Sequence, residues 1–415
     1  MDVVFRRCAG LDVHKKLVVA AAIVEQGVGE ARREQRTFGT MTADLLELSD
    51  WLAGLGVTHV AMEATGEYWK PVFNILEHNF EVTLVNARHV AAVPGRKTDI
   101  NDAQWLADLL RHGLVKPSFI PPVEQRELRD LTRSRTTFVR ERATLANRVQ
   151  KILEGTNIKL ASVATDVIGV SGRAMLSALI EGHATPAQMA ELSKGRMRSK
   201  RDELTKALVG QVKEHHRFIL TELLCQIDGL DETIARFNRE IEAYCAPFHQ
   251  AIPLLDTIPG VGRATAEVIV SEIGIDMSRF EDADHLSSWA GVAPGNHESA
   301  GKRYSGKTRK GNKPLRAALN QAAHAAARTK NTYLAAQYHH LVPHTGKKKA
   351  IMAVAHSILV IAYHVIRKQE PYRDLGRDYF ERLRPEVTSR RLVKRLERLG
   401  YKVSLEKQPD TARAA

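Results

Sequence analysis

The sequence predicts a chain of the class α/β plus all-α, with an α/β layer at the N-terminus and helical units after it. In residues 1–115, short apolar segments typical of strands alternate with amphipathic segments typical of helices. From Glu124 onward, apolar residues recur in steps of three and four, a pattern typical of long packed helices. The chain has 415 residues, 44% of them hydrophobic, so two or three domains with real cores are expected.

The N-terminal unit ends at a proline-rich boundary, formed by Pro117, Pro121 and Pro122. Its predicted strands are Arg7–Val13, Leu17–Glu25, Val57–Met62 and Val82–Asn86, of which the first two form a hairpin. Its predicted helices are Thr42–Leu55, Glu67–His78 and Ile100–His112. Strands alternating with helices in this order imply a sheet that is covered by helices.

Two heptad seams follow, and they predict a long antiparallel helical arm of the coiled-coil type. The first seam is Leu128, Leu131, Arg135, Phe138, Arg142, Leu145, Val149 and Ile152. The second seam, which is apolar throughout, is Leu220, Leu223, Ile227, Leu230, Ile234, Phe237, Ile241 and Tyr244. Pairing of the two helices within one chain and pairing between two chains both satisfy this pattern.

The C-terminal half begins with an apolar helix pair, followed by a Gly- and Lys-rich segment and the Ala-rich helix Leu315–Lys330. The predicted domains are residues 1–118, 119–250, 251–345 and 346–415. The longest nearly apolar run, Ala350–Ile366, is interrupted by His356, Ser357 and His364 and is short for a bilayer. It therefore predicts a buried helix, and no membrane partner is expected.

The amino-acid composition indicates which kind of partner the protein binds and in which cellular compartment it folds. The net charge of +13 predicts a polyanionic partner, because cations that neutralise phosphates release counterions. Only three cysteines occur, far apart, which argues for a reducing compartment and against a disulfide framework or a zinc site. The first residues lack the apolar stretch of a secretory signal, so a cytoplasmic location is expected.

Four carboxylates in the N-terminal unit stand at positions where metal-dependent nucleases of the RNase H type carry theirs. Asp12 lies in the first strand, Glu63 follows the Val57–Met62 strand, and Asp99 and Asp102 open the next helix. A spacing of three places Asp99 and Asp102 on one helical face. Mg²⁺ prefers such hard oxygen ligands, and a pair of ions can clamp both sides of an in-line phosphoryl displacement.

Each acid also has a simpler interpretation. Asp99 or Asp102 alone fits a helix cap, and Glu63 alone fits an ordinary acid at a strand end. Asp12 is harder to explain in this way, because an acid inside an apolar strand costs desolvation unless it is paired or binds a metal. As a set, the four acids favour a metal site.

Residues 258–262 read Ile-Pro-Gly-Val-Gly between two apolar helical segments. The glycines Gly260 and Gly262 permit a tight turn whose amides, with the following helix N-terminus, would face a phosphate. This is the helix–hairpin–helix pattern, a sequence-independent contact with a nucleic-acid backbone. A plain connection between two helices is the alternative.

The segment that follows is rich in glycine and in cations, with seven basic residues from Lys302 to Arg316. The phosphate-binding candidates in it are Lys302, Arg303, Lys307, Arg309 and Lys310. Two hydroxyls there are candidate nucleophiles toward phosphorus. By spacing alone, Ser299 and Ser305 are almost equal candidates, and a plain basic turn remains the alternative to both.

A basic helix, Arg126–Ile158, is a further candidate for nucleic-acid contact. Its cations include Arg133, Arg135, Arg140, Arg142, Arg148 and Lys151. A solvated basic face would show the same pattern, so the choice between the two stays open.

Together these motifs resemble the DEDD-type transposases of the insertion sequence 110 family, in order from about residue 8 to 330. The matching segments are Ala-Gly-Leu-Asp-Val-His-Lys around Asp12, Lys-Thr-Asp-x-x-Asp-Ala around Asp102, the Pro-Gly-Val-Gly hairpin, and Ser-Ala-Gly-Lys with Lys-Gly-Asn-Lys-Pro-Leu-Arg. The resemblance implies a RuvC-like (RNase H-like) N-terminal domain, a coiled-coil arm and a mainly helical C-terminal transposase domain. It also implies Mg²⁺, or Mn²⁺ in its place, held by Asp12, Glu63, Asp99 and Asp102.

The resemblance further implies a serine nucleophile, which maps onto Ser299, although Ala300 stands where glycine is common. It implies a structured non-coding guide RNA that pairs with donor and target DNA, and a homo-oligomer, dimer or tetramer, acting at the nucleoid of a prokaryotic cell. Residues 346–415 are longer than compact members of the family require.

Two other functions compete with strand transfer. One is a hydrolytic RuvC-like endonuclease of the junction-resolvase type, in which a metal-activated water attacks and Ser299 only contacts phosphate. Such an enzyme would not need the arm or the second basic unit. The other is a nucleic-acid-binding protein without activity, for which four acids inside a basic chain make little sense unless a cation intervenes.

Overall fold

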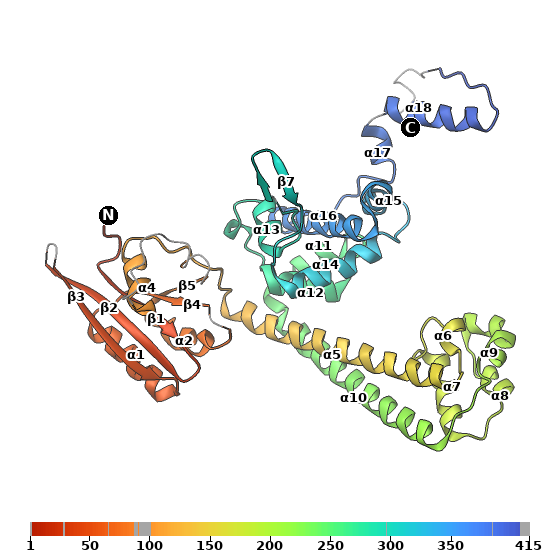
Figure 1. The fold of residues 1–415 in the computed structure, drawn as a ribbon, viewed down its shortest axis with the longest axis horizontal. Coiled ribbons are helices and arrows are strands. Elements are labelled where there is room, and N and C mark those ends of the chain that lie inside the picture. The colour runs from red at the N-terminus through yellow and green to blue at the C-terminus, as the bar shows by residue number, and fades with distance from the viewer. Residues whose placement is uncertain are drawn as a thin grey trace. The chain divides into compact units, whose positions relative to one another are not determined.

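The computed structural model describes residues 2–27, 30–64, 66–86, 90, 101–295, 297–383 and 385–406. It divides the chain into two units, Met1–Pro121 and Pro122–Ala415. The first unit is built on a mixed sheet, and the second is almost entirely helical (Figure 1). An α/β N-terminal layer followed by helical units, the predicted fold class, is therefore confirmed.

The first unit contains a five-stranded sheet in the order β3-β2-β1-β4-β5. The strands are β1 Arg7–Val13, β2 Leu17–Gly27, β3 Glu30–Gly39, β4 His59–Glu63 and β5 Glu81–Val85. The first three form an antiparallel meander, whereas β4 and β5 run parallel to β1. The sheet is thus mixed, with β1 at the junction between its antiparallel and parallel halves.

Strand β3 was not predicted, because its sequence lacks apolar alternation. Most of its side chains are exposed, and only Phe38 near its end is buried. A polar strand of this kind is typical of a sheet edge, where charged residues discourage pairing with other chains. The pairing with β2, and not the sequence pattern, makes this segment a strand.

Helices cover both faces of the sheet. The helices are α1 Thr42–Gly54, α2 Trp69–Leu76 and α4 Asp102–Arg111. Ala9, Leu11 and Val13 of β1 pack in one cluster with the buried residues of α1 and α2. The alternate residue Cys8 packs with Ala107 of α4 on the other face. Successive strand residues point to opposite faces, so Gly10 and Asp12 share the α4 side with Cys8.

The second unit begins with the predicted arm. Helices α5 (Val123–Gly155) and α10 (Glu214–Tyr244) pack antiparallel within one chain, as Figure 1 shows. The rings of Phe138 and Phe237 lie 5.2 Å apart in the middle of the arm. Leu153 and Leu220 share the cluster at one end of the arm. The sequence left pairing within and between chains open, and the structure shows the first; a coiled-coil geometry stays a prediction.

The ends of the arm depart from strict heptads. Tyr244, the last residue of the second predicted seam, is 38% exposed. On α5, the polar side chains of Gln125 and Thr132 are buried, although neither belongs to the predicted seam. Short helices close the far end: α6 Leu160–Val163, α7 Val170–Glu181, α8 Pro186–Glu191 and α9 Arg201–Ala207.

The rest of the second unit is a helical domain with one large apolar core. Its helices are α11 Ala251–Asp256, α12 Arg263–Ile273, α13 Ala283–Ala290, α14 Lys313–Ala326, α15 Tyr333–Thr345 and α16 Lys347–Lys368. Within the described part of the chain, α16 alone is long and apolar enough to cross a membrane. Its residues Val354, Ile358 and Tyr363 are buried in the domain core, as predicted for Ala350–Ile366.

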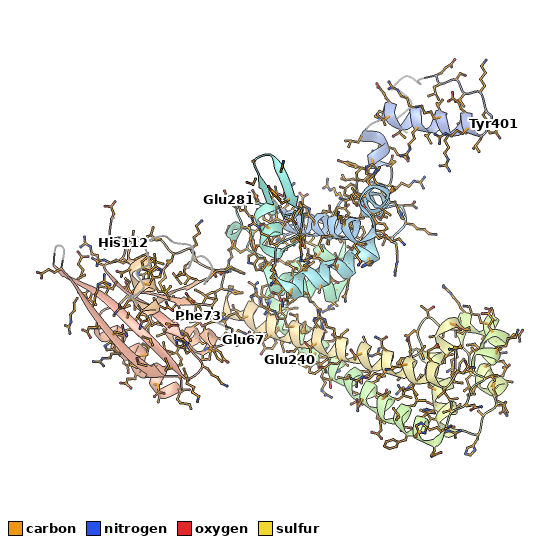
Figure 2. The ribbon with its side chains drawn as sticks, in the orientation of Figure 1. Glu67, Phe73, His112, Glu240, Glu281 and Tyr401 are labelled. Carbon is orange, nitrogen blue, oxygen red and sulfur yellow. The ribbon has the colours of Figure 1, made fainter. Side chains whose placement is uncertain are left out.

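Two helices, α17 (Tyr379–Leu383) and α18 (Pro385–Arg398), follow the core. Helix α17 packs against α15, whereas α18 has no buried residue. Tyr401, just beyond α18, is 64% exposed, and its side chain is labelled in Figure 2. The extension therefore has an anchored first part and an exposed second part.

Candidate active site

Asp12 stands one residue before the end of β1, on the side of the sheet that α4 covers. A Cβ atom on Gly10, two residues earlier, would lie 2.2 Å from the carbonyl oxygen of Ala103, so only glycine lets α4 lie this close to the strand. The Asp12 side chain is 21% exposed, and its Oδ2 lies 3.1 Å from Nε2 of His14. The histidine is thus a partner for this carboxylate.

Glu63 is the last residue of β4, the strand next to β1. The parallel pairing places Leu11 opposite Met62, so one further residue brings Asp12 and Glu63 to neighbouring positions at the carboxyl ends of the two strands. Ala61, two residues before Glu63, packs in the cluster on the α4 side. Glu63 therefore shares this face of the sheet with Asp12.

Asp102 is the first residue of α4. Cys8 Sγ lies 3.6 Å from the carbonyl oxygen of Ala107, and Gly10 lies against Ala103. Strand β1 and helix α4 therefore run in opposite directions. Asp12 therefore faces the beginning of α4. The cap of this helix is Asn101, whose side-chain oxygen accepts a 3.0 Å hydrogen bond from the backbone N–H of Ala103. The alternative role of Asp102 as the cap is therefore wrong.

The acidic positions fit a hard metal ion in kind, because carboxylate oxygens are the ligands that Mg²⁺ prefers. Asp99, the fourth predicted ligand, lies outside the described residues. In the part of the chain that is described, no group of three or more His, Cys, Asp or Glu side chains is close enough to hold a metal ion. The sheet thus brings Asp12, Glu63 and Asp102 to one region without completing a metal site.

Ser299 lies at the tip of a small hairpin that projects from the helical domain (Figure 1). The strands are β6 His297–Ser299 and β7 Lys302–Ser305, with Ser299 paired to Lys302. Between them, Ala300 (φ 51°) and Gly301 (φ 74°) form a two-residue turn with both residues in the left-handed region, as hairpin turns of type I′ require. Ser299 and Lys302 are exposed, next to each other at the turn.

Ser305 occupies a different place, at the base of the same hairpin. It pairs with His297, and its hydroxyl accepts a 3.1 Å hydrogen bond from the backbone N–H of Lys307. The two serines that spacing alone left equal therefore differ: Ser299 lies beside the turn, and Ser305 stabilises the loop after β7.

The basic segment contains exposed cations but packed glycines. Lys307, Arg309 and Lys310 are exposed, like Lys302, whereas the side chain of Arg303 lies outside the described part of the structure. A Cβ on Gly295 would lie 2.1 Å from the carbonyl oxygen of Lys307. Likewise, a Cβ on Gly311 would meet the backbone of Ala290 at 2.4 Å. These two glycines let the loop pack closely on its own domain.

The two glycines of the predicted helix–hairpin–helix also have different surroundings. Gly260 (φ 86°) faces α14, where a Cβ would lie 2.3 Å from the carbonyl oxygen of Ala322. The missing side chain of Gly260 thus lets this turn pack closely against α14. Gly262 precedes the first residue of α12 and faces open space, so a phosphate contact at this turn would fall to Gly262 and the helix N-terminus.

Three arginines of the basic helix predicted at Arg126–Ile158 form ion pairs with acids of other helices. Arg133 binds Glu272, Arg135 binds Glu267 at 2.5 Å, and Arg142 binds Asp231. Packing therefore gives these three arginines a structural role on α5, and contact of the six cations with nucleic acid stays a prediction. The pairing follows from the acids on α10 and α12, which lie far away in the sequence.

The remaining arm cations, Arg140, Arg148 and Lys151, are exposed. Arg140 and Arg148 line a groove of about 610 Å³ between α5 and α10, together with Thr137, Gln226 and Thr233. Gly229 lines the same groove, and a Cβ there would meet nothing within 4 Å. The groove thus combines two exposed arginines with one acid, Glu141.

The sequence patterns did not point to Glu272, a fully buried carboxylate on α12. Its Oε1 accepts a 2.7 Å bond from Nε of Arg133, and its Oε2 accepts a 2.6 Å bond from Nδ2 of Asn312. Burial lowers the pKa of the neighbouring Arg129 to about 10, although Glu272 opposes this shift. The one signal in the sequence was an acid inside the apolar run of α12.

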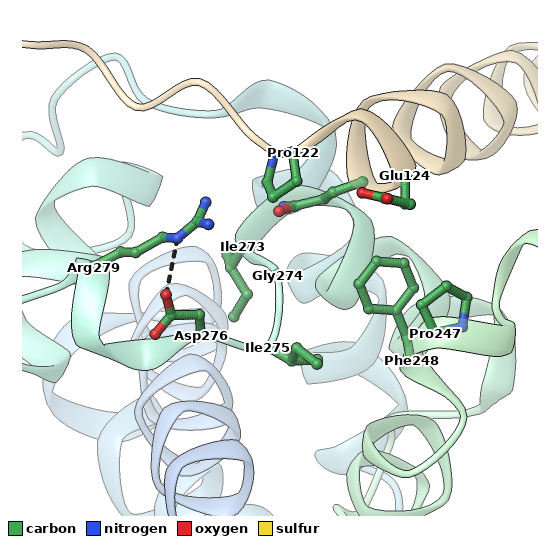
Figure 3. A pocket seen from close by; sticks show the side chains of 10 residues that line it. Pro122, Glu124, Pro247, Phe248, Ile273, Gly274, Ile275, Asp276 and Arg279 are labelled. Atoms are coloured by element: carbon green, nitrogen blue, oxygen red, sulfur yellow. Dashed lines mark hydrogen bonds and ion pairs between the residues drawn. The ribbon is translucent and has the colours of Figure 1, made fainter. Parts of the chain in front are cut away.

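A separate small pocket lies at the base of the arm (Figure 3). Phe248, Ile273 and Ile275 give it an apolar lining, and the Asp276–Arg279 ion pair of 3.1 Å closes one side. Hydrogen bonds from Ser278, the largest cause, lower the pKa of Asp276. The lining also includes the carboxylate of Glu124, so this pocket is mainly apolar with two acids, one of them paired.

Comparison with known proteins places these motifs in a family. A transposase model of the DEDD, IS110 type matches residues 9–158, and the model of the transposase IS116/IS110/IS902 family matches residues 252–340. The chain is 27% identical over 292 residues to a probable family 20 transposase of Pseudomonas aeruginosa, covering 68% of this chain and 75% of that protein. It is 26% identical over 352 residues to the pilin gene-inverting protein of Moraxella bovis, covering 81% and 89%.

A solved structure of T. thermophilus RuvC in complex with Holliday junction substrate is 14% identical, with a TM-score of 0.20, and the match covers 27% of this chain and 99% of that chain. The two family matches stand in the order of the motifs, the first over the carboxylates and the basic helix and the second over the glycine turn and the serine hairpin. From these matches and the transposase relatives, the chain belongs to the IS110 family of DNA transposases.

Proposed function

We propose that this transposase cuts and rejoins DNA strands with Ser299 as nucleophile, beside a metal site formed by Asp12, Glu63, Asp99 and Asp102. The observation that carries the proposal is the common face of Asp12 and Glu63, at the carboxyl ends of adjacent strands and opposite the start of α4. Acids gathered in a protein of net charge +13 repel DNA unless a cation lies between them.

The acids and the serine divide the chemistry. When bound, Mg²⁺, or Mn²⁺ in its place, would neutralise phosphate charge and stabilise the leaving oxygen. Asp12 and Glu63 would hold it, and His14 would orient the Asp12 carboxylate through their 3.1 Å contact. The proposal places the acids and the serine of different subunits at one DNA strand, so the active unit is a homo-oligomer.

Ser299 supplies the transfer step. Its Oγ forms a bond to phosphorus, the bond between phosphorus and a sugar oxygen breaks, and the serine proton passes to the released sugar hydroxyl. A hydroxyl of the second DNA end then attacks the phosphoserine, and the proton returns to Ser299. Because a serine hydroxyl is a weak nucleophile, it needs nearby positive charge, which Lys302 across the turn would provide.

The choice of DNA sites is assigned in this proposal to a structured non-coding RNA that pairs with donor and target strands. The arm groove at Arg140 and Arg148 supports it, because two exposed arginines and several hydroxyl and amide side chains, against the one acid Glu141, suit a sugar–phosphate backbone. Recombination should therefore require the element's RNA as well as protein and DNA.

The decisive experiment detects the covalent intermediate. Purified protein, labelled donor and target DNA and element RNA are incubated with Mg²⁺ and resolved on denaturing gels. We expect labelled DNA to be attached to the parent protein. Ser299→Cys should carry only a trace of attached DNA, and Ser299→Ala should carry none. Ser305→Ala is the matched control and should keep both adduct and product. If Ser299→Ala yields recombinant DNA at the parental rate, the serine mechanism is wrong and hydrolysis takes its place.

A further inference from the structure

The C-terminal extension is held against the helical domain by specific contacts. The backbone N–H of Tyr372 donates to Oγ1 of Thr257 at 2.9 Å, beside the glycine turn of residues 258–262. Asp374 accepts a 3.0 Å bond from the backbone N–H of Tyr333 at the start of α15. The ring of Phe380 stacks on Tyr333, with centroids 5.7 Å apart. Residues 372–380 are therefore a fixed part of this domain.

Beside these contacts lies a cavity of about 520 Å³ with a basic lining. Arg328 and Lys330 follow α14, His339 lies on α15, and Arg377 comes from the extension. The one acid in the lining is Glu381. Three permanent cations thus face one carboxylate around a single cavity, and they come from segments almost fifty residues apart in the sequence.

The position of Arg377 is set by the turn between α14 and α15. Its Nη1 donates to Oδ1 of Asn331 at 3.3 Å, and Asn331 itself has a left-handed φ of 61°. Asparagine tolerates this conformation better than most residues, because its short polar side chain bonds locally. The turn therefore presents one side chain to Arg377 and leaves the rest of the guanidinium to the cavity.

The cavity borders the glycine turn before α12. A Cβ on Gly260 would lie 2.5 Å from the backbone nitrogen of Ala326, and the next residue, Ala327, lines the cavity. At the N-terminus of α15, the backbone N–H of Ala335 donates to Thr332 and the backbone N–H of Tyr333 donates to Asp374. These two N–H groups are therefore not available to a ligand. Binding of an anion here would therefore depend on the cationic side chains.

We propose that this cavity binds a phosphodiester of nucleic acid, and that the extension completes it by supplying Arg377. A guanidinium matches a phosphate with two parallel hydrogen bonds, and the cavity has the volume of an ordinary ligand site, about 300 to 1,000 Å³. The inference rests on the affinity of this transposase for nucleic acid and is independent of Ser299 or of any metal.

The test compares a double variant, Arg328→Gln with Arg377→Gln, with Arg373→Gln. Arg373 is the matched control, because it lies in the same extension, is 86% exposed, and does not line the cavity. Binding to labelled duplex DNA and to single-stranded RNA of equal length is measured by fluorescence anisotropy at several salt concentrations. EDTA is present throughout, so strand cleavage and adduct formation cannot affect the result.

For the double variant we expect affinity to fall roughly ten-fold near ~0.1 M salt and the slope of log K against log salt to fall by about 2. A loss on duplex DNA identifies DNA as the source of the phosphodiester, and a loss on RNA alone identifies RNA. Arg373→Gln should bind like the parent. If the double variant folds, by circular dichroism, and keeps parental affinity and slope on both probes, the proposal is overturned, whatever the fate of the serine mechanism.

Discussion

The carboxylate of Glu272 and the side-chain amide of Asn312 are joined by a 2.6 Å hydrogen bond. Asn312 caps α14, since its Oδ1 accepts a 3.0 Å bond from the backbone N–H of Leu315. Glu272 also binds Arg133 of the arm, at 2.7 Å. One buried carboxylate therefore connects the arm with the segment that leads from the serine hairpin into α14.

Glu272→Gln should lower the free energy of unfolding by roughly 3 kcal/mol, because it breaks a buried ion pair. This value is the lower end of the usual range, since Arg133 is partly exposed and can be hydrated. Urea unfolding followed by circular dichroism measures this change. Glu281→Gln is the control, because Glu281 is exposed and forms a 3.3 Å surface contact with His285. Equal stability of the two variants would show that the network does not hold the arm.

Asp12→Asn should abolish strand cleavage and leave DNA affinity unchanged or slightly higher, because it removes a negative charge at nearly constant volume. Chelation of divalent metal should have the same effect on the parent protein. Gel assays of cleavage and anisotropy of binding separate the two quantities. Asp50→Asn, an exposed position on α1, should cleave normally. Cleavage by the parent in excess EDTA would contradict a metal site at Asp12.

Ala300→Gly should stabilise the serine hairpin by up to about 1 kcal/mol, because Ala300 has a φ of 51° and an L side chain is strained there. Greater freedom of glycine in the unfolded chain offsets part of this gain. Ala300→Val should act in the opposite direction, since a β-branched residue is worse in the left-handed region. Hydrogen exchange of the β6 and β7 amides reports both changes. Faster exchange in the glycine variant would disprove strain at the turn.

Arg140→Glu combined with Arg148→Glu should weaken RNA binding steeply and reduce its salt dependence, because both side chains line the arm groove. Arg142→Gln is the informative control. Arg142 is engaged by Asp231, so its loss should lower stability by up to about 1 kcal/mol with little change in RNA affinity. Filter binding at two salt concentrations distinguishes the variants, and parental affinity of the double variant would remove this groove from the RNA site.

Local periodicity was enough to predict much of the fold. A short apolar segment identified β1, amphipathic spacing identified the helix Thr42–Leu55, and heptad steps identified both arm helices. The resemblance of the motifs as a set indicated the family, and the two family matches confirm it.

Partners distant in sequence decided the rest. The charges of Arg133, Arg135 and Arg142 suggested contact with nucleic acid. In the structure, each of these arginines forms an ion pair with an acid of another helix. A strand such as β3 depends on hydrogen bonds from β2, which no local pattern encodes.

The same limit applies to the sites. By itself, the sequence determined which residues can do chemistry, because that depends on their functional groups. Only the tertiary structure decided that Gly260 packs on α14 while Gly262 stays open, and that Ser299 lies at a hairpin tip while Ser305 bonds its own loop. Exposure and hydrogen bonding arise from contacts between segments far apart in the chain, and these contacts form only when the whole domain folds.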